Sequence, residues 1–147
     1  ALALHATVMG ADLACSYARE YERGRDRLSP RLVEIIEQGQ RVTAVAYRRA
    51  LAAAADLRRS LDPVFARYDA ILTPATAGEA PAGLESTGSP AFCTIWTLLG
   101  LPAVTLPLLQ GPSGLPVGVQ IVGPWGNDAR LLRTARWLER AAAGGEA

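Results

Sequence analysis

The sequence predicts an α/β fold, and three observations lead to this class. Residues 1–68 carry many charges and apolar residues at helical spacing, whereas residues 69–126 contain short apolar runs separated by proline and glycine. Residues 127–143 then have the pattern of an amphipathic closing helix. The length of 147 residues is enough for one domain or for part of a larger one.

The composition excludes several kinds of function. Hydrophobic residues make up 50% and charged residues 20% of the chain, which is typical of a globular protein. The net charge of +1 is too small to indicate binding to a nucleic acid or an anionic membrane surface, so we expect neither as a partner. No lysine occurs, and this chain therefore cannot complete any mechanism that needs a lysine. One histidine and two cysteines are too few for a zinc site, so we expect no metal and no cofactor.

The N-terminal segment does not resemble a secretory signal, because no basic residues precede its apolar ones. We therefore expect a cytoplasmic protein in which Cys15 and Cys93 are free thiols. The stretch from Ser86 to Asn127 contains no charged residue, but its prolines prevent an unbroken transmembrane helix. We interpret this stretch as the packed interior of a soluble protein.

Two helices are expected at the start of the chain. The first covers residues 2 to about 23. The second begins at Ser29 and Pro30, because serine can cap a helix and proline is tolerated at the first helical position. We expect Gly39 to end this second helix in a left-handed conformation.

A longer helix is expected next, with Thr43 as its N-cap residue. An alanine run at residues 52–55 favours helix and permits close packing. The apolar residues that recur in it at helical spacing are Leu57, Leu61, Val64, Phe65 and Tyr68.

The following segment is predicted to contain a short buried strand, a long loop and a short helix. The strand covers residues 70–73 and stops at Pro74, and the loop covers residues 74–89. The helix runs from Pro90 through Leu98. Loops of this length in compact domains are often functional.

Residues 103–109 and 117–122 are predicted to form a hairpin, because a glycine-containing turn separates them. In the second strand, Val117, Val119 and Ile121 alternate with other residues and form one apolar face.

The closing helix is predicted to have Asn127 as its N-cap and to end at Gly144 and Gly145. Its inward face is expected to consist of Leu131, Leu132, Ala135 and Leu138.

Three polar groups are candidates for chemistry, each with a structural alternative that we favour. His5 could deprotonate a nucleophile, but it has no fixed partner. Cys93 lies near a predicted helix start and could be a nucleophile, but inert buried thiols are common. The serine-rich residues 86–89 could form a nucleophile loop or an anion cradle, yet they lack the context of a nucleophile elbow.

Aromatic residues could line an apolar ligand pocket, namely Phe92, Trp96 and Trp125. Core packing is the alternative for all three and is favoured for Trp125. Gln120 is a polar amide in an apolar strand, so it should be buried and hydrogen-bonded. Its role is then either architectural or a contact with a partner segment.

Three ordered segments carry a specific resemblance: YDAILTPAT, SPAFCTIWTLLGLPAVTLPL and GLPVGVQIVGPWGNDARLLRTARWLE. They strongly resemble the C-terminal part of the amidase signature family, and the resemblance spans about Ser29 to Arg140. It implies a fold with helices packed on a mixed sheet. Residues 1–147 are then expected to form a single partial domain with a mainly helical segment (1–68), a segment of strands, loops and a short helix (69–126), and the closing helix (127–143).

The resemblance also implies amide chemistry. Members of the family use a Ser–cis-Ser–Lys triad and form a covalent acyl-enzyme, whose oxyanion is held by backbone N–H groups. The signature segment and the triad belong to the N-terminal half of the family, which this sequence lacks. We therefore assign no catalytic residue, expect the chain to be inactive alone, and leave open whether it is an enzyme.

The substrate side of the site can be transferred by resemblance. In the family, the segment that matches residues 92–97 approaches the acyl part of the substrate, and the loop after the matching Thr73 and Pro74 flanks it. The apolar character of these residues suggests an uncharged or aromatic acyl group. The predicted substrate-binding residues are Phe92, Cys93, Trp96, Thr73 and Pro74.

Our leading interpretation is the C-terminal fragment of an amide hydrolase, which contributes core structure and part of the acyl-substrate pocket. The alternative is a non-catalytic binding or assembly subunit derived from an amidase, and a third interpretation is an enzyme that depends on Cys93. The expected partners are a small-molecule amide and either the missing N-terminal half or a triad-bearing subunit. An apolar face left uncovered by that half would also favour a homo-oligomer.

Overall fold

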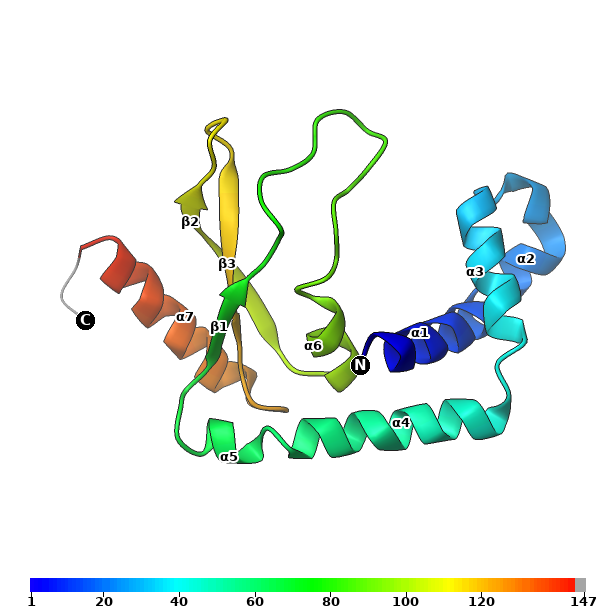
Figure 1. Ribbon diagram of the computed structural model, residues 1–147, viewed down its shortest axis with the longest axis horizontal. Helices are drawn as coiled ribbons and strands as arrows, with labels where there is room; N and C mark the ends of the chain where they lie inside the picture. Colours follow the sequence, from blue (N-terminus) through cyan, green and yellow to red (C-terminus); the bar gives the residue numbers. More distant parts are fainter. Residues whose placement is uncertain (145–147) are drawn as a thin grey trace. The chain divides into compact units, whose positions relative to one another are not determined.

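The computed structural model describes residues 1–144 and divides into two compact units, residues 1–57 and residues 58–147. Each unit is described by itself below (Figure 1). Gly145, which was predicted to help end the last helix, lies outside the described residues. Among the described residues, no helix combines the length and the apolar character needed to cross a membrane.

The first unit consists of helices. Their bounds are α1 (Leu2–Ser16), α2 (Ala18–Gly24), the 3₁₀ helix η1 (Arg25–Arg27), α3 (Pro30–Gln40) and α4 (Ala44–Arg59), the last of which continues into the second unit. The prediction of one helix over residues 2–23 was wrong, because the backbone of Tyr17 (φ −100°, ψ 14°) leaves the helical region and separates α1 from α2.

The start of α3 confirms the predicted cap, since the Leu32 N–H donates to Ser29 Oγ at 3.3 Å. The predicted end was wrong. Gly39 lies inside α3 and does not have a positive φ. Its small size serves packing instead, because a Cβ at Gly39 would collide with the backbone of Gly10 in α1.

The start of α4 is also confirmed, because the Ala46 N–H donates to Thr43 Oγ1 at 3.1 Å. Its predicted continuation to Tyr68 was wrong: α4 ends at Arg59, and α5 (Asp62–Phe65) follows as a separate short helix. Pro63 explains the break, since proline has no N–H for the helical hydrogen bond and its ring obstructs the preceding turn. Leu57 and Tyr68, which were expected on an apolar face, are exposed.

The second unit is built on a three-stranded sheet with the order β1-β3-β2. The strands are β1 (Ile71–Pro74), β2 (Ala103–Gln110) and β3 (Pro116–Val122), and both pairings are antiparallel. The α/β class and the hairpin of the last two strands are therefore confirmed. The expectation that the first strand is buried was wrong for Leu72, which is 61% exposed because β1 lies at an edge of the described sheet.

Helix α7 (Asp128–Ala142) packs on one face of the sheet. The core here contains Ile121, Leu131 and Ala135, with Leu138 packed against them. Asn127 caps the helix as predicted, because its Oδ1 accepts the Arg130 N–H at 3.2 Å. Leu132 was predicted to face inward but is exposed. The buried residues of α7 lie along one side of the helix, and Leu132 lies beside that side and not on it.

Candidate functional site

The candidate site lies on the sheet face opposite to the α7 core. Ile121 faces that core, so its neighbour Gln120 faces the other side of the sheet. In the register of the sheet, Thr73 of β1 and Thr105 of β2 lie directly across from Gln120. The site is therefore centred on the middle strand of the described sheet.

Gln120 is buried and hydrogen-bonded, as the sequence predicted. Its side chain is 4% exposed. The amide Nε2 donates to Thr73 Oγ1 at 3.2 Å and to the Phe92 carbonyl at 3.1 Å. One side chain thus connects β1 to the segment that precedes α6 (Thr94–Leu99).

The thiol of Cys93 belongs to the same cluster. Its Sγ lies 3.4 Å from the Ala75 carbonyl oxygen and 3.6 Å from Gln120 Oε1. A thiol has one proton, so it donates to one of these acceptors at a time. Four of the five predicted substrate-binding residues, Thr73, Pro74, Phe92 and Cys93, are thereby gathered around Gln120, since Pro74 follows Thr73 in β1.

The segment from Pro90 to Thr94 folds as a hydrogen-bonded turn. The Pro90 carbonyl accepts from the N–H groups of Cys93 (2.9 Å) and Thr94 (3.0 Å), and also from Thr94 Oγ1 at 2.9 Å. The predicted helix start at Pro90 was therefore wrong, because this turn delays α6 until Thr94. It also holds the Phe92 carbonyl where Gln120 can reach it.

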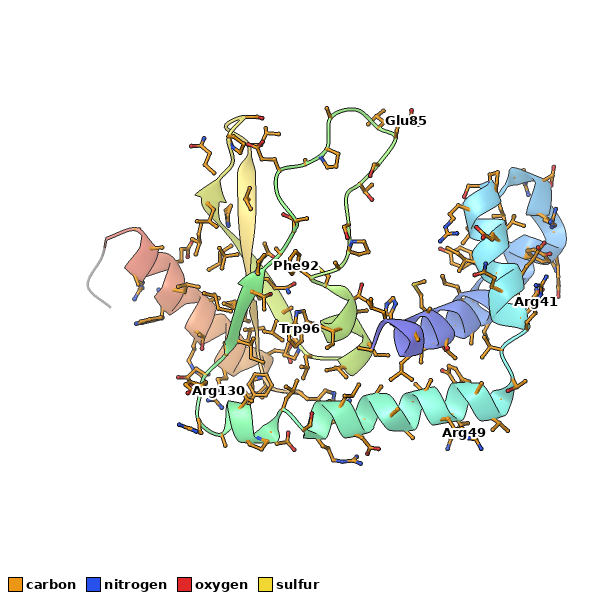
Figure 2. All side chains as sticks on the ribbon, in the orientation of Figure 1. Arg41, Arg49, Glu85, Phe92, Trp96 and Arg130 are labelled. Carbon is orange, nitrogen blue, oxygen red and sulfur yellow. The ribbon has the colours of Figure 1, made fainter. Side chains whose placement is uncertain are left out.

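Trp96, the fifth predicted residue, lies on α6 and is partly buried. Its Nε1 is buried without a hydrogen-bond partner among the described residues. Phe92 is 37% exposed, and Figure 2 labels both aromatic residues near α6. Phe92 supplies aromatic surface at the Gln120 cluster, and Trp96 supplies it on α6, which begins two residues after Phe92.

The long loop between β1 and α6 is fastened to the β2–β3 hairpin. Glu79 Oε1 accepts from the N–H groups of Ser113 and Leu115, both at 2.9 Å. Sequence reasoning missed this residue, because its partners are backbone groups more than thirty positions away. Residues 81–90 are all exposed, and Figure 2 shows Glu85 at the tip of the loop.

The other candidates do not join the cluster. Residues 86–89 lie in the exposed part of the loop, which agrees with the favoured interpretation of a solvent loop. Trp125 was expected in the core, but it is 63% exposed, and the Arg58 guanidinium lies 4.6 Å from the centre of its ring. His5 lies on α1 in the first unit.

Gly118 is a second residue that sequence reasoning missed. The Ala75 N–H donates to the Gly118 carbonyl at 3.0 Å, and a Cβ at Gly118 would lie 3.0 Å from Ala75 Cβ and would collide with Thr105. Glycine inside a strand often marks such a close approach, which was the available signal. This contact fixes the beginning of the long loop against β3.

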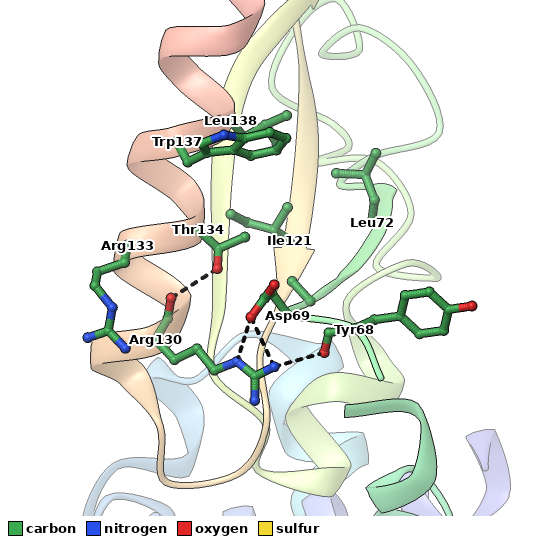
Figure 3. Close-up of a pocket in the computed structure, with 10 residues that line it drawn as sticks. Tyr68, Asp69, Leu72, Ile121, Arg130, Arg133, Thr134, Trp137 and Leu138 are labelled. Atoms are coloured by element: carbon green, nitrogen blue, oxygen red, sulfur yellow. Dashed lines mark hydrogen bonds and ion pairs between the residues drawn. The ribbon is translucent and has the colours of Figure 1, made fainter. Parts of the chain in front are cut away.

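A groove of about 640 Å³ lies on the opposite, α7 face of the sheet (Figure 3). Leu72 and Trp137 border it, with Ile121 between them in this view. Arg130 donates from Nε to Asp69 Oδ1 at 3.0 Å and from Nη2 to the Tyr68 carbonyl at 3.2 Å. None of the five predicted substrate-binding residues lines this groove, so we do not assign it to the site.

Among the described residues, the side chains with clearly shifted pKa values belong to the first unit. Hydrogen bonds from Arg25 and then from Tyr21 lower the pKa of the Glu37 carboxyl. The hydrogen bond to Asp12 raises the pKa of Tyr47. Within residues 1–144, no three histidine, cysteine or acidic side chains come together as a metal site.

The sequence matches the model of the family described as Amidase over residues 8–132. A protein of Mycobacterium leprae named as an amidase, AmiC, is 38% identical over 97 residues, which cover 58% of this chain and 21% of that protein. A glutamyl-tRNA(Gln) amidotransferase subunit of Agathobacter rectalis is 35% identical over 101 residues, which cover 64% of this chain and 20% of that protein.

Solved structures show the same fold. A crystal structure of an amidase superposes with a TM-score of 0.80 at 27% identity, over 95% of this chain and 35% of that one. The 6-aminohexanoate cyclic dimer hydrolase gives a TM-score of 0.72 at 24% identity, over 92% of this chain and 33% of that one. The chain thus spans about a fifth of the length of these curated relatives and about a third of these solved chains.

Proposed function

Because this chain belongs to the amidase family, we propose that it contributes the C-terminal part of the acyl-substrate pocket of an amide hydrolase. Phe92, Cys93 and Trp96 contact the acyl group of the substrate, and Thr73 and Pro74 flank it. The observation that supports this most directly is the Gln120 cluster, in which one buried amide is bonded to both β1 and the turn before α6.

The proposed reaction is acyl transfer through a covalent intermediate. The attacking serine and its Ser–Lys partners come from polypeptide outside this sequence, because the chain contains no lysine to complete the triad. The serine attacks the amide carbon, backbone N–H groups hold the oxyanion, the amine leaves, and water releases the acid. The chain itself shapes the pocket and is inactive alone.

The proposed substrate is an amide with an uncharged or aromatic acyl group, acted on in the cytoplasm. Phe92 and Trp96 offer aromatic surface, and the charge-free stretch from Ser86 to Asn127 supplies no ion to clamp a charged group. The triad-bearing segment or subunit is the proposed partner.

Trp96→Ala tests this pocket in the native polypeptide or complex that contains the sequence. We expect kcat/KM for aromatic acyl amides to fall about tenfold, with a smaller loss for acetamide, because the apolar contact area shrinks. Trp125→Ala is the matched control, since this exposed tryptophan lies against Arg58. Equal rates for all acyl groups before and after Trp96→Ala would refute the pocket assignment.

A second candidate is a non-catalytic binding or assembly subunit. The observation that favours it is that relatives such as the Agathobacter rectalis protein are named as one subunit of an amidotransferase. Purification of the native protein separates the two: a stable complex that does not hydrolyse amides supports the assembly role, and hydrolysis supports the pocket.

Catalysis by Cys93 is the third candidate. Its thiol lies next to a carbonyl and an amide oxygen, neither of which can take up its proton as a general base does. Alkylation followed by an unchanged rate of amide hydrolysis would eliminate it.

A further inference from the structure

We infer that Gln120 is a positioning residue, which locks the two ends of the long loop together and so fixes the wall that faces the acyl group. This inference rests on the proposed function. It adds a residue that does not touch the substrate but determines where Phe92 and Cys93 lie.

The geometry uses both N–H donors of the amide for this task. A glutamine amide has two N–H donors, and here they go to Thr73 Oγ1 and to the Phe92 carbonyl. The Oε1 acceptor lies within reach of the Cys93 thiol at 3.6 Å. The side chain is 4% exposed, so water cannot replace these partners without an opening of the structure.

The tied positions are the two ends of one loop. Thr73 and Ala75 lie at its beginning, and Phe92 and Cys93 lie at its end. Between Ala75 and Cys93 the described chain forms no helix or strand that could fix the C-terminal end of the loop. Gly118 holds the first end through the Ala75 N–H, and Gln120 joins the second end to the same strand.

The arrangement has a consequence for selectivity. Because the polar atoms of Gln120 are bound within the protein, the amide is not available to the substrate. The acyl group meets the side chains of Phe92 and Trp96, and it is selected by shape and apolar contact. A shift of the Phe92–Cys93 turn by about 1 Å would spoil that fit.

The test uses Cys93 as a reporter in the 147-residue chain with Cys15→Ser, which leaves one thiol. Gln120→Met keeps the length and volume of the side chain but removes its donors and acceptor. We expect N-ethylmaleimide to label Cys93 about tenfold faster in this variant, because the turn opens more often. Gln110→Met is the matched control: Gln110 bonds the Gly114 carbonyl at the exposed end of β2, and its loss should not change the rate.

Thr73→Val provides a second, milder variant. It removes the acceptor of one Gln120 donor while keeping the branched shape, and we expect labelling about threefold faster. Urea unfolding of each variant separates local opening from global destabilisation. Unchanged labelling in both variants, or acceleration fully explained by lower global stability, would overturn the positioning role.

Phenylacetamide, added while Cys93 is labelled in the native polypeptide or complex that contains the sequence, distinguishes this inference from the proposed function. Protection of Cys93 in this native species that is lost in its Gln120→Met variant supports both. Absence of protection in the native species counts against the pocket, whereas protection that persists in Gln120→Met at the same labelling rate counts against the positioning role alone.

Discussion

Two polar side chains, Gln120 and Glu79, attach the long loop to the β2–β3 hairpin. Gln120 in β3 donates to the Phe92 carbonyl near the C-terminal end of the loop. Glu79, within the loop, accepts from two backbone N–H groups of the hairpin turn. A carboxylate that accepts two N–H groups forms charge-assisted hydrogen bonds, which are stronger than neutral ones. Single residues therefore order a segment that has no regular secondary structure.

Glu79→Ala tests the second attachment. We expect the amide hydrogens of Ser113 and Leu115 to exchange at least about tenfold faster, because both lose their acceptor. Glu85→Ala is the control, since Glu85 lies at the exposed tip of the same loop. Exchange that stays as slow as in the parent chain would show that Glu79 does not anchor the hairpin.

The sequence predicted one of these residues and not the other, for a physical reason. Gln120 stands out because a polar amide in an apolar strand must be buried and satisfied. Glu79 resembles any loop glutamate, since its partners become neighbours only when the loop folds onto the hairpin. Gly118 is an intermediate case. A glycine inside a strand indicates a close approach of another segment, but the sequence does not show which segment approaches.

At the scale of helices and strands, caps were predictable and interruptions were not. Ser29, Thr43 and Asn127 cap helices as expected, because a cap depends on a few adjacent residues. The break at Tyr17 carries no proline or glycine signal. Gly39 has the usual signal of a helix end, but a contact with a distant helix explains it instead.

Gly39→Ala tests that contact. We expect the free energy of unfolding to fall by about 1–3 kcal/mol, because the new Cβ would overlap the backbone of Gly10 and push α1 from α3. Gly10→Ala is the matched control: its Cβ would lie 3.5 Å from Gly39 Cα, an ordinary contact, so that variant should be neutral or gain up to about 1 kcal/mol of helix propensity. Equal effects of the two substitutions in urea unfolding would contradict this assignment.

At the scale of the whole molecule, the α/β class was predictable because helical and strand periodicities occupy different parts of the sequence. The order of the strands was not predictable, since the paired residues of β1 and β3 are more than forty positions apart in the sequence. The organisation as a single partial domain stays a prediction, and the chain divides into two compact units.

The central claim is that this chain shapes the pocket of an amidase and that the attacking serine comes from elsewhere. Hydrolysis of phenylacetamide, followed as release of phenylacetate, tests it in two samples: the purified 147-residue chain and the native polypeptide or complex that contains the sequence. We predict no hydrolysis by the chain and turnover by the native species. Turnover by the purified chain at the native rate would contradict the account.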